Sequence, residues 1–196
     1  MTERASPGEP MLIPALHAIR NPNALGKLLL PFNVGPNQGN SRAVTADAML
    51  MRPVLYLQHG RVTTFRCYVG TAVAASKARI GLYQVAADGT PGSIIGESND
   101  IDTTAVGMRS AAAIANFTVY PGWYYLAIVS SGAVAFSPFE DGLLQPALTP
   151  AGTTSSGISY VNLVDNLTAG WTALPATPAI DTTDSLRIPA CFLEFT

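Results

Sequence analysis

The sequence predicts an all-β fold, a jelly-roll-like β-sandwich that carries an extended N-terminal arm. Three observations favour this class: many short apolar runs of strand length, Gly- and Pro-rich turns between them, and no long amphipathic helical pattern. The best helix candidate, residues 43–57, is interrupted by Pro53 and by β-branched residues. We therefore divide the chain into an arm, residues 1–50, and a sandwich domain, residues 51–196.

Residues 1–50 are expected to form an extended arm that serves assembly. Six prolines from Pro7 to Pro36 interrupt the apolar clusters, so neither a long helix nor a central strand is expected there. The arm nevertheless carries apolar side chains that need a surface to pack against. We expect that surface to belong to a neighbouring copy or another protein; the alternative is that the arm completes its own sheet. The residues assigned to these assembly contacts are Leu12, Ile13, Leu16, Leu28, Leu29 and Phe32.

Strand patterns begin after Pro53. Residues 62–69 alternate between an apolar face and a polar or aromatic face, which is the pattern of a half-buried strand. Residues 79–85 form a second run, and the Gly- and Pro-containing turn at 87–92 leads back to an apolar pair at 94–95. We expect these two runs to form a hairpin.

The second half of the chain holds the clearest candidate for a central strand. A short run at 117–120 ends at a Pro-Gly pair, and residues 123–129 then restart with apolar side chains on both faces. This pattern is typical of a strand that is covered on each side. After Ser137 the chain is rich in loop residues, and residues 188–195 are expected to form the closing strand.

Composition favours an assembled protein and argues against two classes of partner. Charged residues make up 12% of the chain, about half of the roughly 25% in an ordinary soluble domain, so we expect neighbouring subunits to cover part of its surface. A net charge of -2 provides no basic surface for nucleic acid. No run approaches the roughly 18 apolar residues that a membrane span needs, and the N-terminus lacks secretory-signal features.

Two cysteines are too few for a disulfide framework or a zinc ribbon. In the expected strands, Cys67 shares a face with Phe65, and Cys191 shares a face with Leu193. We expect buried free thiols, and a disulfide between the two is the alternative.

The usual catalytic signatures are missing from the sequence. It has two histidines, His17 in the arm and His59 near a turn, and no nucleophile elbow, H-E-x-x-H helix or P-loop. We therefore expect no enzymatic activity and no cofactor, and assign no catalytic, cofactor-binding or metal-binding residue. The paired acidic residues lie beside Gly, Ser, Thr or Asn and are expected to cap turns; they are Asp100 and Asp102, Glu140 and Asp141, and Asp181 and Asp184. A Ca²⁺ site at Asn99, Asp100 and Asp102 is the alternative, although the D-x-D-x-D-G pattern is lacking.

The aromatic residues could form a second kind of site, because flat aromatic faces beside polar groups bind sugars. For the strand aromatics at 123–125, a place in the core or in an interface is the simpler interpretation. Trp171 lies in an expected loop. Together with Tyr160, it is our candidate for contact with a ligand or a partner.

Three short segments form a recognisable pattern: RIGLYQV at 79–85, DGTPG at 88–92 and YPGWYYLA at 120–127. This pattern resembles β-sandwich domains of tailed-phage fibre, spike and other virion proteins, and the resemblance covers residues 60–130 best. It implies a virion component, often a trimer, that assembles with other virion proteins and can contact host-surface glycans. We carry over no binding residues from it.

A structural subunit of a phage-type virion explains the low charge, the apolar arm and the missing catalytic motifs together. We therefore predict this function, and a location in the virion. A carbohydrate-binding β-sandwich module outside a virion is the alternative; it explains the sandwich and the aromatic residues but leaves the arm unexplained. An esterase or glycosidase explains least.

Overall fold

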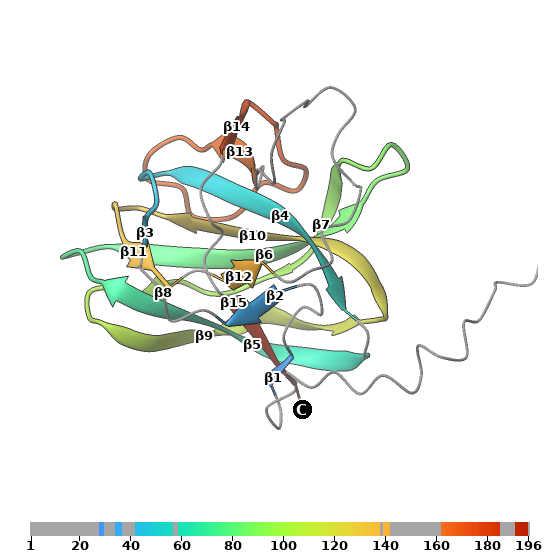
Figure 1. Ribbon diagram of the computed structural model, residues 1–196, viewed down its shortest axis with the longest axis horizontal. Coiled ribbons are helices and arrows are strands. Elements are labelled where there is room, and N and C mark those ends of the chain that lie inside the picture. Colours follow the sequence, from blue (N-terminus) through green and yellow to red (C-terminus); the bar gives the residue numbers. More distant parts are fainter. Residues whose placement is uncertain are drawn as a thin grey trace, which may run out of the picture.

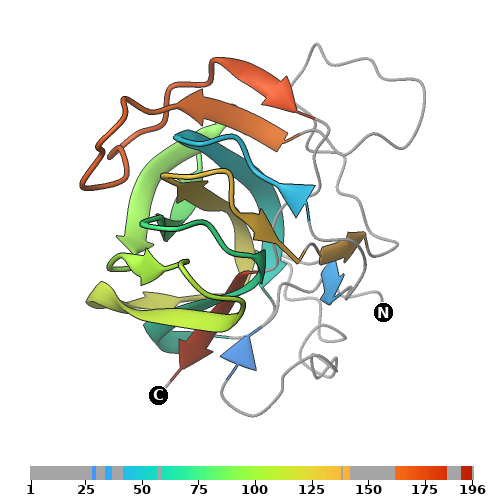
Figure 2. The same cartoon turned by 90° about the vertical axis from the view of Figure 1, so that its left-hand side faces the viewer.

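A computed structural model describes residues 28–29, 34–36, 42–56, 59–137, 139–141, 162–184 and 191–195. These residues form strands, turns and loops without a helix, which confirms the predicted all-β class. Two curled antiparallel sheets face each other in a sandwich-like half-barrel (Figures 1 and 2). Within these ranges, no helix is long and apolar enough to cross a membrane.

The first sheet is built around β5. Its strand order is β1-β15-β5-β11-β3, and β9 also pairs with β5. The predicted alternation in β5 buries Phe65, Cys67 and Val69 toward the second sheet. A bulge after Val62 turns that residue to the same buried side, although it is three positions from Phe65. The strands are β1 Leu28–Leu29, β3 Arg42–Ala43, β5 Gly60–Thr71, β9 Gly107–Val119, β11 Ala135–Phe136 and β15 Cys191–Phe195.

The second sheet has β10 at its centre, in the order β14-β13-β4-β10-β6-β7, with β8 paired to β6. Leu126 and Ile128 of β10 belong to the main core between the sheets, whereas Tyr125, Ala127 and Val129 belong to a second core on the opposite face. The predicted central strand with two covered faces is therefore confirmed. The strands are β4 Ala48–Tyr56, β6 Lys77–Val85, β7 Pro91–Glu97, β8 Ile101–Asp102, β10 Gly122–Ser130, β13 Asn162–Asn166 and β14 Thr182–Asp184.

The predicted hairpin is formed by β6 and β7, which pair antiparallel. Its turn is closed by a hydrogen bond from Ala86 N to Thr90 O at 2.8 Å, and Gly89 supplies a φ of 85°. The Asp88 carboxylate accepts bonds from the amide and the hydroxyl of Thr90 at 3.0 and 2.7 Å. Turn residues therefore act here by the mechanism that the sequence predicted.

Strand β4 is an element that the sequence pattern did not predict, because Pro53 lies within it and proline disfavours a central strand. Tyr125 of β10 faces Pro53 on one side of β4. On the other side, β13 pairs with β4 from Ala48 to Met51 in the described residues.

The described parts of the predicted arm pair with strands of the same chain. Leu28 and Leu29 form β1 and pair with residues 193–194 of β15. Further along, β2 (Val34–Pro36) pairs with β12 (Phe139–Asp141), and β3 pairs with β11. β1 and β3 extend the first sheet at its two edges, whereas β2 and β12 form a separate two-stranded sheet. The other assigned assembly residues, Leu12, Ile13, Leu16 and Phe32, lie outside the described ranges.

Candidate functional site

The segment after β13, residues 167–181, covers the outer face of the second sheet, and we call it the covering loop. Trp171 and Leu174 of this loop pack on side chains of β4, β6 and β10, and Leu167 packs against the edge of the same cluster. A simple two-layer sandwich would leave this sheet face open to water. Here a loop closes it. The buried members of this second core are Met49, Met51, Tyr83, Tyr125, Ala127, Val129, Trp171 and Leu174.

Trp171, the candidate for contact with a ligand or partner, is mostly inside the protein, with 8% of its surface exposed. Its indole Nε1 donates a hydrogen bond to Asp47 Oδ1 at 2.9 Å. The Lys77 ammonium lies 5.0 Å from the ring centroid, within the range of a cation–π contact. The ring is therefore held in one orientation. Tyr160, the other candidate, lies outside the described residues.

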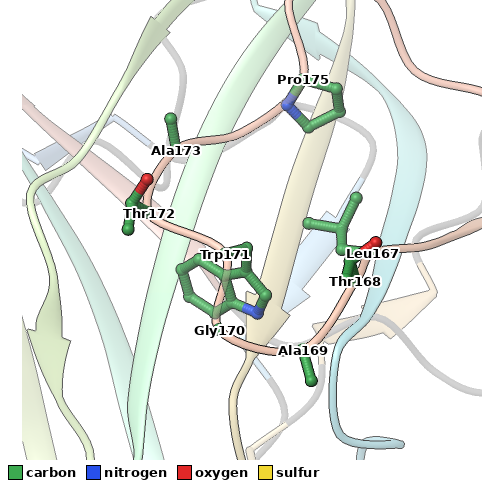
Figure 3. A pocket seen from close by; sticks show the side chains of 8 residues that line it. All are labelled: Leu167, Thr168, Ala169, Gly170, Trp171, Thr172, Ala173 and Pro175. Carbon is green, nitrogen blue, oxygen red and sulfur yellow. The ribbon is translucent and has the colours of Figure 1, made fainter.

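A shallow cavity of about 340 Å³ lies on the covering loop (Figure 3). Its lining combines apolar groups with the hydroxyls of Thr168 and Thr172 and contains no charged side chain. A volume of this size lies near the lower end of the range for small-molecule pockets. The cavity could hold a small neutral group. It is lined by Leu167, Thr168, Ala169, Gly170, Trp171, Thr172, Ala173 and Pro175.

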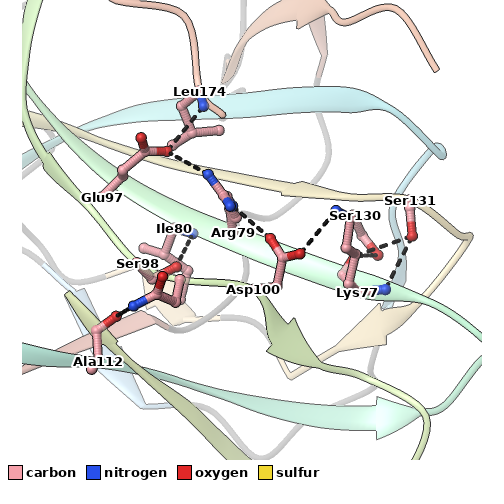
Figure 4. A network of polar contacts seen from close by, with 11 residues as sticks. Lys77, Arg79, Ile80, Glu97, Ser98, Asp100, Ala112, Ser130, Ser131 and Leu174 are labelled. Carbon is pink, nitrogen blue, oxygen red and sulfur yellow. Dashed lines mark hydrogen bonds and ion pairs between the residues drawn. The ribbon is translucent and has the colours of Figure 1, made fainter. Parts of the chain in front are cut away.

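A chain of polar contacts joins the covering loop to the β6–β7 hairpin (Figure 4). Asp100 accepts from Lys77 Nζ at 2.9 Å and from Arg79 Nε at 2.6 Å. Arg79 Nη1 in turn lies 3.3 Å from Glu97 Oε2, which also accepts the Leu174 amide at 2.9 Å. Because the Arg79 and Glu97 side chains are only 11% and 18% exposed, this chain of contacts fixes the loop position more firmly than surface ion pairs would.

The acidic residues considered for calcium are used in other ways. Burial opposes the charge of Asp100, but hydrogen bonds from Lys77 and Arg79 outweigh burial and hold its pKa below the usual value. Asp102 Oδ1 accepts from the amide and hydroxyl of Thr104 at 2.9 and 2.6 Å, which confirms its predicted role in a turn. The described residues contain no group of three His, Cys, Asp or Glu side chains suited to a metal ion.

The two cysteines are free and fully buried, as predicted. Burial raises the pKa of Cys67 to about 12, and it raises the pKa of Cys191 well above its usual value. At neutral pH both are protonated thiols, which are poor nucleophiles. His59 is exposed just before β5.

Most strand aromatics that could have formed a sugar-stacking platform belong to the cores. Tyr83 and Tyr125 are buried, and their hydroxyls donate to Pro175 O at 3.0 Å and to Gly89 O at 2.6 Å. Tyr124 is partly buried and packs on Tyr56 with ring centroids 5.9 Å apart. These contacts agree with the core interpretation. Among the described residues, two aromatic side chains are exposed, Tyr68 of β5 at 40% and Tyr120, between β9 and β10, at 63%.

Asp47 is a site residue that sequence reasoning missed. It lies in the turn before β4 with a φ of 60°, a conformation that Asp tolerates better than most residues. Its partner Trp171 is 124 positions away in the chain. A turn-forming Asp before a strand is the one local signal, and it does not indicate which distant side chain the carboxylate meets.

The chain matches no known protein-family model, and it has no significant sequence match among curated proteins. The resemblance to virion domains therefore rests on the three short segments quoted above.

Proposed function

We propose that the protein is a non-enzymatic structural subunit of a phage-type virion, such as a component of a tail fibre, head fibre or spike. It assembles with other virion proteins and with further copies of itself, and the resemblance favours a trimer. Contact with host-surface glycans is part of what the resemblance implies. The observation that carries the proposal is an exposed apolar surface along β9, a strand with one charged residue, Arg109.

This β9 surface consists of Tyr68, Val106, Met108 and Ile114, which are between 40% and 57% exposed. Tyr68 and Met108 lie directly opposite each other in the β5–β9 register. From Ser110 to Val119 the strand carries no charged residue. Exposed apolar groups along a long uncharged strand are typical of a surface that another chain covers.

The partly open side of β9 strengthens this argument. Among the described strands, β9 forms a ladder with β5. On its other side Ala113 bridges to Ser98, which lies between β7 and β8, and Ala112 O accepts from the amide and the side-chain Nδ2 of Asn99 at 2.8 and 3.2 Å. Soluble monomers usually protect such an edge with charged residues or proline. β9 has Arg109 near its start and no proline. The low overall charge and the apolar residues Leu12, Ile13 and Leu16 also fit a protein that is buried in an assembly.

Oligomeric state tests the role of the β9 surface. We expect the full-length chain to form a homo-oligomer in light scattering and sedimentation. The double variant Met108→Glu/Ile114→Glu should dissociate into monomers that still unfold cooperatively, with a melting temperature that no longer depends on protein concentration. Ile180→Glu is the matched control, because Ile180 is 41% exposed but lies in the covering loop. A wild-type chain that stays monomeric at high concentration, with both variants behaving alike, would count against self-assembly.

The virion itself is tested by labelling. Particles purified from a lysate that contains the protein should bind an antibody to this chain in electron micrographs, at a regular position on the particle. Particles produced without the chain should not be labelled. Finding the protein only in the soluble fraction would refute the proposal.

A carbohydrate-binding module outside a virion is the second candidate, and the cavity beside Trp171 is the observation in its favour. The full-length chain would then bind a glycan, and Thr172→Arg would block binding by filling the cavity without touching either core. The same chain would be monomeric and absent from particles. The burial of Tyr83, Tyr125 and most of Trp171 argues against this candidate, because their ring faces are already covered.

A further inference from the structure

The two cysteines of the chain lie opposite each other on neighbouring strands. Cys191 begins β15, and its partner in the antiparallel register is Cys67 of β5. Both side chains are fully buried in the main core, so they point to the same side of the first sheet. Opposed residues in such a pair have Cα atoms about 4.5 or 5.5 Å apart, within the range of about 4.4 to 6.8 Å found for disulfides.

We propose that Cys67 and Cys191 form a reversible disulfide across β5 and β15 when the protein meets a low-molecular-weight disulfide such as oxidised glutathione. One cysteine thiolate attacks a glutathione sulfur, forms a mixed disulfide and releases one glutathione. The second cysteine thiolate then attacks the protein sulfur of that mixed disulfide and releases the other glutathione. The cysteines lose two electrons and two protons in total, and these reduce glutathione disulfide to two thiols.

Burial makes this reaction slow in the closed structure. The reactive species is the thiolate, and the pKa of each buried thiol is raised, even though Arg109 lowers that of Cys67 to some extent. Glutathione also cannot reach a side chain with no exposed surface. Oxidation therefore requires local opening of β15, a strand of five residues close to the end of the chain. The Arg66–Glu194 ion pair at 2.6 Å is one of the contacts that resist this opening.

Strand geometry explains why the bond would be reversible. Opposed residues have Cβ atoms about 4.5 to 5.5 Å apart, whereas a disulfide needs about 3.5 to 4.5 Å. The two strands must therefore approach slightly, and a disulfide that stores strain is more easily reduced. If the proposed function is correct, a particle that leaves a cell moves from a reducing to an oxidising environment, where such a bond persists. The thiol pair would react in the same way in a protein of any other function.

Mass spectrometry on the folded, full-length chain tests this inference. The chain is incubated with oxidised glutathione, quenched in acid, unfolded and treated with N-ethylmaleimide. We expect a monomer that has lost two hydrogen atoms and binds no maleimide, and dithiothreitol should restore both thiols. Since the sequence has two cysteines, that mass assigns the bond to Cys67 and Cys191. The controls Cys67→Ala and Cys191→Ala cannot form the bond within one chain; their one remaining thiol can form only a mixed or an intermolecular disulfide.

Thermal unfolding provides a second measurement. We expect the oxidised wild-type chain to melt roughly 4 to 16 °C above the reduced chain, the range for one disulfide in a domain of this size, with no such shift in either alanine variant. Three results would overturn the inference: thiols that stay free in the folded chain although the urea-unfolded chain reacts, products that are only mixed or intermolecular disulfides, and an oxidised chain that melts below the reduced one.

Discussion

Replacing Trp171 with alanine tests whether the covering loop is part of the hydrophobic core. Trp171 is 8% exposed and packs among the residues of the second core. Truncation of a buried Trp to Ala costs about 3 to 5 kcal/mol. The bond from its Nε1 to Asp47 contributes to that loss, although Asp47 is partly exposed and water can replace the lost donor. We therefore expect Trp171→Ala to lower the free energy of unfolding by about 3 to 5 kcal/mol.

A subtler pair of changes separates packing from hydrogen bonding. Trp171→Phe keeps most of the apolar contact and removes the donor, so we expect a loss of about 1 to 2 kcal/mol, near the lower end for a bond to a charged group. Asp47→Gly removes the acceptor without backbone strain, because glycine accepts the φ of 60°. The two changes should be non-additive in a double-mutant cycle, since each removes the same hydrogen bond.

Urea unfolding followed by far-UV circular dichroism is the assay, because changing one of two tryptophans alters the fluorescence signal. Tyr120→Ala is the control, since this aromatic side chain is 63% exposed and should change stability by no more than about 0.5 kcal/mol. If Trp171→Ala is as mild as Tyr120→Ala, the covering loop does not close a core. The role assigned to it would then be wrong.

Three further predictions concern other parts of the molecule. Gly96→Ala should lower the free energy of unfolding, measured in urea, by about 1 to 3 kcal/mol, because a Cβ there would overlap the Phe117 ring. Gly89→Ala is the control, since Gly89 has open space around it and only its positive φ disfavours alanine. A smaller loss for Gly96→Ala than for Gly89→Ala would contradict the prediction. Asp100 has a folded pKa below its ordinary value of 3.8, so its contribution to stability is present above that pH and is lost as the pH falls through the folded pKa. Asp100→Asn should therefore lower the melting temperature at pH 7 and converge with wild type in acid, whereas parallel curves would refute the ion-pair argument. Deletion of residues 1–27 should leave a soluble, cooperatively melting domain that no longer assembles; an insoluble product would mean that this segment belongs to the core.

Local sequence patterns predicted the strands whose own residues, or the turns next to them, show a clear pattern. Residues 123–129 are apolar on both faces, and this alone indicated a central strand with two covers. The turn at 87–92 could be predicted because Asp, Gly and Pro act on the backbone within a few residues. β4 escaped prediction because Pro53, which lies within it, normally excludes a central strand.

The sequence by itself determined the all-β class, the β6–β7 hairpin and the burial of both cysteines, because periodicity and turn chemistry depend on residues that are close in the chain. Only the tertiary structure decided that Cys67 lies opposite Cys191 and that Asp47 accepts the indole N–H of Trp171. These pairings depend on strand register and on how a loop folds over a sheet. Both are set by the packing of many side chains at once, so no local pattern encodes them.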